Sequence, residues 1–253
     1  QPNPYDKSKS LPLEGVVNLQ AWAGFSNRSI NSVTAEFKPS WLEWFLSGEQ
    51  QKFTINSGAL VWQPEVEGWL LKSHKLNFST NEFTWPELSL VAHKTEQGVG
   101  ANLSQLQLDM LLPLLPLIPG IGLDTLQTWQ SLKPTGKIKD INAHWNNLYQ
   151  QPKVSLALDN VAWAAHQGIP GLAPFDASIS FVDTEIGFNL PKQNYLIDFD
   201  GGFEAPLNMQ GDSFSGNFNL SDLALSLPHV HFSNPDLDIK AGVRLEFADA
   251  VHM

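Results

Sequence analysis

Two histidines have a spacing that could serve metal chemistry. His229 and His231 are separated by one residue, so on a strand their imidazoles lie on the same face, as metal ligands often do. The sequence places no carboxylate at an evident third position beside them. A polar strand face is therefore the simpler interpretation, and we predict no metal site.

Two pairs of aspartates have the residue type that general acid and base catalysis requires. Asp198 with Asp200, and Asp236 with Asp238, are each two residues apart. Both pairs lie in turn-like segments, DFDGG and NPDLD, where Asp commonly caps backbone N–H groups. The chain contains no Gly-rich phosphate loop, no nucleophile elbow and no HExxH motif. The sequence thus predicts a protein that is not an enzyme, with no catalytic residue and no cofactor.

The composition excludes further classes of function. The 253 residues carry a net charge of −11 with only 15 Lys and Arg, whereas nucleic-acid binding needs clustered cations. There is no Cys, which removes disulfides and thiol chemistry. Nine Trp and fifteen Phe, against only 16% charged residues, indicate large apolar surfaces that a core or an apolar partner must cover.

The elements that must position these residues are short strands. In PFDASISF, Phe175, Ala177, Ile179 and Phe181 alternate with polar residues, which is the period of a half-buried strand. More than ten such runs are separated by Gly, Pro, Asn and Asp turns. The expected fold class is mainly β, with mostly antiparallel strands.

The aromatic residues leave two arrangements open. Five Trp fall in alternating runs, and each therefore lies on one face of a sheet: Trp62, Trp69, Trp85, Trp145 and Trp163. One arrangement is the core of a β-sandwich. The other is an open apolar trough, because several runs, such as GWLL and VSLAL, are apolar on both faces and must bury one of them against the sheet itself or a ligand.

The segment DMLLPLLPLIPGIGL, residues 109–123, is the most apolar part of the chain. It is shorter than the roughly 20 residues of a membrane-spanning helix, and Pro113, Pro116 and Pro119 prevent a regular helix. We predict instead one helical insertion near 109–133 made of two short helices, the first after Asp109 and the second from Leu123.

The insertion is expected to pack four leucines onto the sheet: Leu111, Leu112, Leu115 and Leu126. They would either cap a trough or complete an ordinary core, and the sequence does not separate these two roles. The spacing of Trp41, Leu42, Trp44 and Phe45 is also compatible with a further short helix near residues 40–47.

Several of these motifs resemble the YhdP-like proteins of the AsmA-like superfamily. The run NLSQLQLDMLLPLLPLIPGIGLDTLQTWQSLKPTGKIKDINAHW is similar to their central region, and INSGALVWQPEVEGWLLKSHKLNF and VAWAAHQGIPGLAPFDASISF are similar to neighbouring elements in the same order. Two forty-residue segments, from Phe53 to His93 and from Leu207 to Phe247, also repeat a Ser-Gly opening followed by three strands. The resemblance covers roughly residues 53 to 247, while the first fifty residues match loosely.

The resemblance implies a non-enzymatic lipid transfer segment of a longer periplasmic protein of Gram-negative bacteria. That protein would be anchored in the inner membrane by a helix outside this chain. Its strands would form a long, twisted and curled antiparallel sheet, a repeating β-groove, whose hydrophobic interior would carry phospholipid acyl chains toward the outer membrane and so support the outer-membrane barrier. Nucleic acid is excluded as a partner, and other envelope proteins are allowed.

From this resemblance we expect three parts of one elongated domain: β-groove segments at 1–98 and 134–253, and a strand with the helical insertion at 99–133. The residues expected to line a groove or a core are Leu60, Trp62, Leu156, Leu158, Trp163, Ile179, Phe181, Phe188 and Leu190. The alternative is a β-sandwich binding or scaffold module of the cell envelope. A glycan-binding version would use Trp22 and Trp145, which lie near Gln20 and Asn146.

Overall fold

The computed structural model describes residues 2–3, 6–10, 14–46, 49–118, 120–148, 150–199 and 201–246. The chain divides into two compact units. Unit 1 comprises Gln1–Ser131 with Asn146–Leu148, and unit 2 comprises Leu132–Trp145 with Tyr149–Met253. The two units are described in turn.

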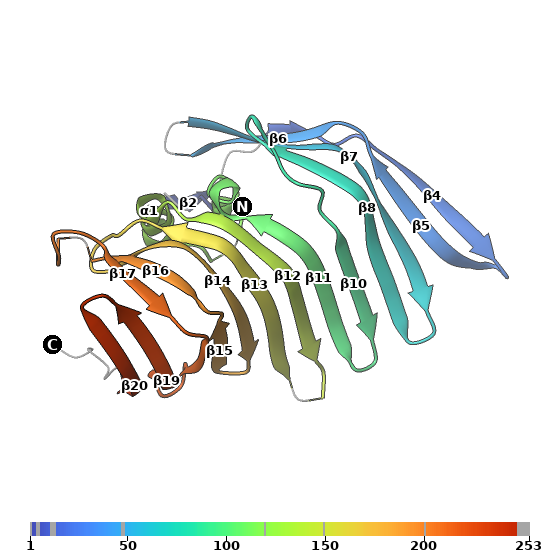
Figure 1. Cartoon of the computed structure of the whole chain (residues 1–253). Coiled ribbons are helices and arrows are strands. Elements are labelled where there is room, and N and C mark those ends of the chain that lie inside the picture. Colours follow the sequence, from blue (N-terminus) through green and yellow to red (C-terminus); the bar gives the residue numbers. More distant parts are fainter. Residues whose placement is uncertain are drawn as a thin grey trace. The chain divides into compact units, whose positions relative to one another are not determined.

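Unit 1 consists of antiparallel strands with a helical insertion, and its first two strands, β1 and β2, form a small sheet of their own. Its strands, drawn from blue to green in Figure 1, are β1 (Pro2–Asn3), β2 (Asp6–Ser10), β3 (Glu14–Val16), β4 (Leu19–Ser26), β5 (Ser29–Phe37), β6 (Ser40–Leu46), β7 (Glu49–Glu65), β8 (Gly68–Thr80), β9 (Phe83–Thr84), β10 (Leu90–Thr95) and β11 (Gly98–Gln107). The insertion follows β11 and consists of the 3₁₀ turns η1 (Leu108–Met110) and η2 (Leu115–Leu117) and the helix α1 (Leu123–Leu132).

The long strand β7 changes partner halfway along its length. Its first half pairs with β6 and its second half with β5. Between the halves the register slips at residues 55–59, where Gly58 has a φ of +132° and its Cα faces the backbone of Leu76 on β8. A side chain at Gly58 would stand 2.7 Å from Leu76 Cα, so this bend requires glycine. In Figure 1, the ribbons of β7 and β8 are bent along their length.

Unit 2 repeats this arrangement of long strands that exchange partners. Its strands are β12 (Thr135–Asn146), β13 (Gln151–Trp163), β14 (Gly171–Val182), β15 (Glu185–Leu190), β16 (Gln193–Asp198), β17 (Leu207–Gly211), β18 (Phe214–Asn219), β19 (Ala224–Asn234) and β20 (Leu237–Glu246). One end of β14 pairs with β16 and the other with β15, and β19 pairs in the same way with β17 and β18. Register slips after Leu158 and after Leu227 let the paired strands bend.

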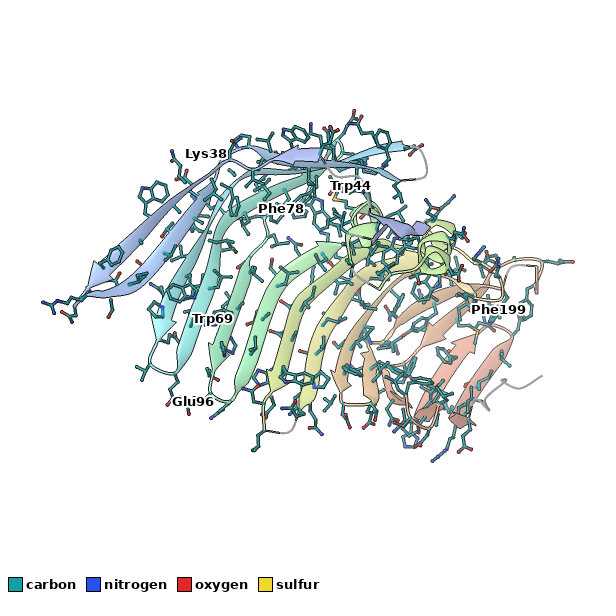
Figure 2. All side chains as sticks on the ribbon, turned by 180° about the vertical axis from the view of Figure 1, so that it is seen from behind. Lys38, Trp44, Trp69, Phe78, Glu96 and Phe199 are labelled. Atoms are coloured by element: carbon teal, nitrogen blue, oxygen red, sulfur yellow. The ribbon has the colours of Figure 1, made fainter. Side chains whose placement is uncertain are left out.

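The buried core of unit 1 lies between β6 and the helical insertion. Trp44 is 1% exposed, and its Nε1 donates a hydrogen bond of 3.1 Å to the carbonyl oxygen of Pro113. Leu115 and Leu126 of the insertion are also buried. Figure 2 shows Trp44 beside the helical turns. The insertion is thereby fixed to the sheet by both apolar packing and a hydrogen bond that satisfies the buried indole N–H.

An aromatic cluster forms the core of unit 2. Tyr195 on β16 contacts Phe214 and Phe232 at ring-centroid distances of 6.2 and 5.6 Å, and those two rings are 5.4 Å apart. Burial raises the pKa of the Tyr195 hydroxyl, while a hydrogen bond from Gln193 opposes this change. Edge-to-face contacts of this kind add to the stability that apolar burial gives.

The predicted fold class is confirmed, with two local corrections. The further helix near residues 40–47 is wrong: Ser40–Leu46 is strand β6, which pairs with β3 and β7. The sequence SWLEWFL also alternates with period two, placing Leu42, Trp44 and Leu46 together, and long-range pairing decides between the two periods.

The second correction concerns the start of the insertion. The predicted helix after Asp109 is replaced by η1, a turn and η2, closed by short-range bonds such as Leu114 N–H to Leu111 O at 2.8 Å. Pro113 and Pro116 lack the N–H groups that an α-helix needs. The second predicted helix is present as α1. None of the helices in the described part of the chain has the length and apolarity to cross a membrane.

The two repeated segments both contain three successive antiparallel strands: β7, β8 and β10 in the first and β18, β19 and β20 in the second. Their Ser-Gly openings differ in structure. Gly58 adopts a positive φ at a bend, whereas Gly216 lies in regular strand β18. The division into 1–98, 99–133 and 134–253 stays a prediction.

Candidate functional site

Seven of the predicted groove residues lie on one face of unit 2. Leu156 on β13 is opposite Ile179 on β14, which is opposite Phe188 on β15. Because side chains alternate along a strand, Leu158, Phe181 and Leu190 share this face. Trp163 joins it beyond the bend, since its ring meets Phe175 edge-to-face at 5.5 Å and its Nε1 donates to Pro170 O at 2.8 Å. We call this surface the apolar face of unit 2.

Residues of the last strands extend the apolar face. The register continues from Ile186 to Phe218 on β18, then to Leu225 on β19 and Leu245 on β20. These four residues were absent from the predicted set. The alternation in SFSGNFNL, LALSLPHVHF and LDIKAGVRLEF was the signal that could have identified Phe218, Leu225 and Leu245. Ile186 lies in the same alternating run as Phe188 and Leu190. The apolar face therefore crosses six strands of unit 2: β13, β14, β15, β18, β19 and β20.

The apolar face is only partly covered. Phe175, Ala177, Val161 and Tyr195, at one end of the strands, are buried. Toward the other end, Leu156, Ile179, Phe181, Phe188 and Leu190 are all half-buried. In a closed β-sandwich the central inward-facing residues are buried by the opposite sheet. This part of the face is thus open to an apolar ligand.

Leu60 and Trp62 share one face of β7 in unit 1. Trp62 on β7 lies between Val33 on β5 and Leu71 on β8, and Leu60 lies beside Ala35. Leu60 and Trp62 are half-buried. Contact of these residues, or of those in unit 2, with lipid stays a prediction.

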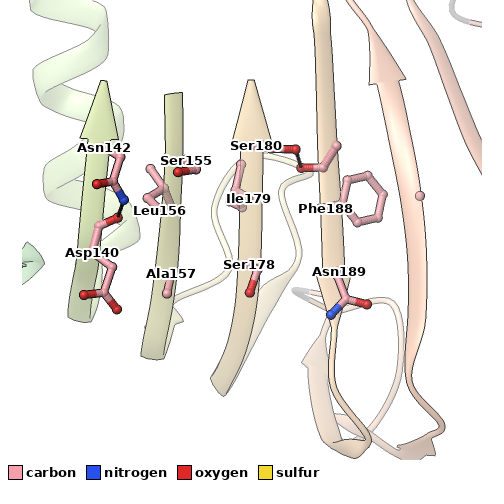
Figure 3. Close-up of a pocket in the computed structure, with 12 residues that line it drawn as sticks. Asp140, Asn142, Ser155, Leu156, Ala157, Ser178, Ile179, Ser180, Phe188 and Asn189 are labelled. Atoms are coloured by element: carbon pink, nitrogen blue, oxygen red, sulfur yellow. Dashed lines mark hydrogen bonds between the residues drawn. The ribbon is translucent and has the colours of Figure 1, made fainter. Parts of the chain in front are cut away.

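The opposite face of unit 2 is polar and built from small side chains. Ser155, Ser178, Ser180 and Asn189 alternate with the apolar residues. A shallow depression of about 490 Å³, shown in Figure 3, is lined by residues of β12, β13, β14, β15 and β18, and these include Leu156, Ile179 and Phe188 as well as the small polar residues. The depression therefore combines hydroxyl and amide groups with apolar side chains.

The four leucines of the helical insertion differ in burial. Leu115 and Leu126 are 6% and 1% exposed, whereas Leu111 and Leu112 are half-buried. Leu115 and Leu126 thus belong to the core of unit 1. A capping role of the four toward a ligand stays a prediction.

His231 has a structural partner on each ring nitrogen. Its Nδ1 lies 2.7 Å from Asp212 Oδ2 and its Nε2 lies 2.9 Å from Asp238 Oδ1. Asp212 also accepts a hydrogen bond of 2.9 Å from Lys192, which, with His231, lowers the pKa of the Asp212 carboxyl. Both nitrogens are occupied, so His231 does not present a free ligand with His229. Among the described residues no group of three or more His, Asp or Glu is arranged to hold a metal ion.

The two aspartates of the second pair, Asp236 and Asp238, have different structural roles. Asp236 lies in the β19–β20 turn, where its N–H donates to Asn234 Oδ1 at 2.9 Å. Asp238 belongs to β20 and its carboxylate contacts His231, so the predicted turn-capping role of Asp238 is wrong. Asp198 ends β16, and Asp200 lies outside the described residues.

Trp22 and Trp145, the residues of the glycan alternative, are 51% and 42% exposed. Trp22 lies on β4, on the same side as Gln20, and Trp145 lies on β12, on the side opposite to Asn146. Gln20 therefore shares a face with Trp22, whereas Asn146 does not share a face with Trp145.

A charged pair ties β12 to β13 in unit 2. The Lys139 ammonium donates a hydrogen bond to the Asp159 carboxylate, which lowers the pKa of Asp159 and raises the pKa of Lys139. A carboxyl with a lowered pKa stabilises the fold above its unfolded pKa, and this contribution is lost as the pH falls through the folded value.

We therefore expect Asp159→Asn to reduce the loss of stability on acidification below about pH 4. Urea unfolding of the wild type and the variant at neutral pH and at about pH 3 measures this. Lys139→Gln should reduce the acid dependence in the same way, because it removes the donor. An unchanged acid dependence in both variants would contradict the assignment of this effect to the pair.

The fold and its two faces define an amphipathic antiparallel β-sheet protein whose apolar face is partly open. A family model described as YhdP protein matches residues 4–253. The chain belongs to the YhdP family, and the match extends further toward the N-terminus than the expected residues 53 to 247. Comparisons with curated proteins and with solved structures gave no match. The family belongs among the AsmA-like transport proteins rather than among known enzymes, and it indicates a periplasmic envelope protein.

Proposed function

We propose that the chain is a non-enzymatic lipid transfer segment that carries phospholipid acyl chains along its apolar face. The observation that carries this proposal is the half-exposed row of large apolar side chains across β13, β14 and β15. A folded chain in water rarely leaves so continuous an apolar surface without a partner. The membership in the YhdP family supports a lipid as that partner.

The chemistry of the face fits acyl chains better than polar ligands. Leu156, Ile179 and Phe188 offer no hydrogen-bonding groups, so binding would rest on apolar contact. Each 100 Å² of apolar surface removed from water contributes about 2.5 kcal/mol. Such contact has no fixed geometry, and an acyl chain could therefore move along the row without breaking specific bonds.

The polar face differs from the apolar face in that it can remain in contact with water while lipid is bound. Ser155, Ser178 and Ser180 stand on the same strands as the apolar residues but point to the other side. Water therefore solvates one side of the sheet while the other side holds the acyl chain. The phospholipid headgroup would remain at the edge of the apolar face, in contact with water.

We also propose the setting in which transfer takes place. The family supports a periplasmic location. There, a full-length protein anchored in the inner membrane by a segment outside this chain would carry phospholipid between the inner and outer membranes. Fractionation of cells that produce the full-length protein would test the anchor: it should remain with inner membranes after a salt wash.

Site-specific photo-crosslinking tests the lipid proposal. A photoreactive phenylalanine analogue at Ile179 should form adducts with phospholipid when the protein is expressed in a Gram-negative host, and mass spectrometry should identify the adduct. The same analogue at Ser178 is the matched control, because this neighbouring residue of β14 lies on the polar face and is exposed.

Equal labelling at the two positions would contradict binding on the apolar face. Absence of lipid adducts at Ile179, together with absence of co-purified phospholipid, would contradict the proposed function. Quenching of Trp fluorescence by an oligosaccharide but not by phospholipid micelles would instead support the glycan-binding alternative at Trp22.

A further inference from the structure

The apolar face has one gap in its central row. The row runs from Leu156 through Ile179 and Phe188 to Gly216 on β18 and then reaches β19. Gly216 supplies no side chain where its neighbours supply large ones. Without compensation, the row would contain a pit one side chain deep.

The ring of Phe188 fills that pit. A Cβ at position 216 would stand 2.6 Å from Phe188 Cζ and 2.5 Å from Leu227 Cδ2, closer than real atoms approach. Phe188 from β15 and Leu227 from β19 thus both lean over the glycine. Figure 3 shows the ring of Phe188 turned away from Ile179. Gly216 needs no positive φ, so the close approach of side chains, and not backbone strain, favours glycine here.

The same packing occurs in the core of unit 2. Tyr195 covers Gly211, where a Cβ would stand 2.6 Å from the Tyr195 ring. Tyr195 is buried, and its role is to complete the core. Phe188 is half-buried on the open part of the face, so its ring forms a surface that a ligand can reach.

We propose that Phe188, lying over Gly216, is the specificity-determining residue that sets how deeply an acyl chain can lie on the apolar face. The inference rests on the proposed lipid-transfer function. When the Phe188 ring lies over Gly216, the row of apolar side chains has an even surface, and an unbranched acyl chain can lie along it. A side chain at position 216 drives the ring outward into the path of the lipid, and loss of the ring opens a pit that accepts a methyl branch.

The first test uses the variant Gly216→Ala of the full chain, in which the new Cβ should push the Phe188 ring outward. The probe is a phosphatidylcholine with a fluorescent acyl chain, supplied in vesicles of unlabelled phosphatidylcholine. Overpacking of this kind should weaken uptake of the probe about tenfold. Phe188→Ala in the same chain should restore uptake to within about threefold of the wild type, because the displaced ring is then gone.

The matched control is Gly187→Ala on β15. A Cβ there would stand 2.8 Å from Ser180 Oγ, on the polar face of the same strands, and uptake should not change. A Cβ at residue 216 would also stand 2.7 Å from the backbone oxygen of Ser226. If strand displacement were the cause, the double variant would bind as weakly as Gly216→Ala, and that result would overturn the proposal. Uptake by Gly216→Ala equal to the wild type would also overturn it.

The second test does not require the crowded variant to fold. Phe188→Ala alone should increase the binding of a methyl-branched-chain phosphatidylcholine, relative to a straight-chain one, by about tenfold. Circular dichroism establishes that each variant is folded. An unchanged ratio would overturn the role of Phe188 while leaving lipid binding itself intact. Failure of the wild type to take up either lipid would instead refute the proposed function.

Discussion

Replacing Trp44 by alanine should lower the free energy of unfolding of unit 1 by about 3–5 kcal/mol. Trp44 is 1% exposed between β6 and the helical insertion, so its removal leaves a large cavity. The carbonyl oxygen of Pro113 also loses its indole donor. Both effects fall on the contact that holds the insertion to the sheet. The shift of the urea unfolding midpoint, followed by circular dichroism, measures the change.

Trp41→Ala is the matched control for this prediction. Trp41 is the same residue type on the same strand, but it points to the other face, where its ring lies 5.0 Å from Lys52 Nζ. Loss of the cation–π contact costs about 0.5–1 kcal/mol, and because Trp41 is only half-buried, its removal should destabilise unit 1 less than removal of Trp44. Equal destabilisation by the two substitutions would contradict the placement of the unit 1 core at Trp44. Phe at position 44 should recover most of the apolar contribution but not the hydrogen bond.

The fold class was predictable because alternation is a local property of each strand. In PFDASISF the apolar and polar faces of the strand follow from the sequence of that strand alone, and β14 shows this pattern from Phe175 to Phe181. The partner of each strand is not local. In SWLEWFL the helical and strand periods coexist, and only pairing with β3 and β7 selects the strand. The same limit applies to the bends, because Gly58 is required by the approach of Leu76 from another strand.

The candidate site was predictable to the extent that it follows alternation. Ile179 and Phe188 could be assigned to apolar positions from sequence, and the register shows that they are neighbours on one face. The packing of Phe188 over Gly216 could not be predicted from the sequence. It depends on the pairing of β15 with β18, and two other strands, β16 and β17, lie between them in the chain. His231 shows the same limit for polar groups, because its partner Asp212 comes from a different part of the chain.

A charge on the apolar face should abolish lipid binding without unfolding the protein. In Leu156→Asp the new carboxylate stands in the central row beside Ile179. It can be hydrated in the free protein because position 156 is half-exposed. A bound acyl chain would strip that water away, and desolvation of an unpaired charge costs several kcal/mol. We expect binding of phosphatidylcholine to fall by at least about a hundredfold, as measured by native mass spectrometry and vesicle uptake.

Ser155→Asp separates this effect from a general effect of charge. It adds the same single negative charge to the adjacent residue of β13, but on the exposed polar face. The net charge of −11 becomes more negative by one in both variants, so long-range repulsion between protein and vesicle changes equally. Ser155→Asp should therefore bind lipid like the wild type. If it loses binding as completely as Leu156→Asp, then overall charge and not the apolar row controls the interaction, and lipid does not lie on this face. If neither variant loses binding, the acyl chain must contact another surface of the chain.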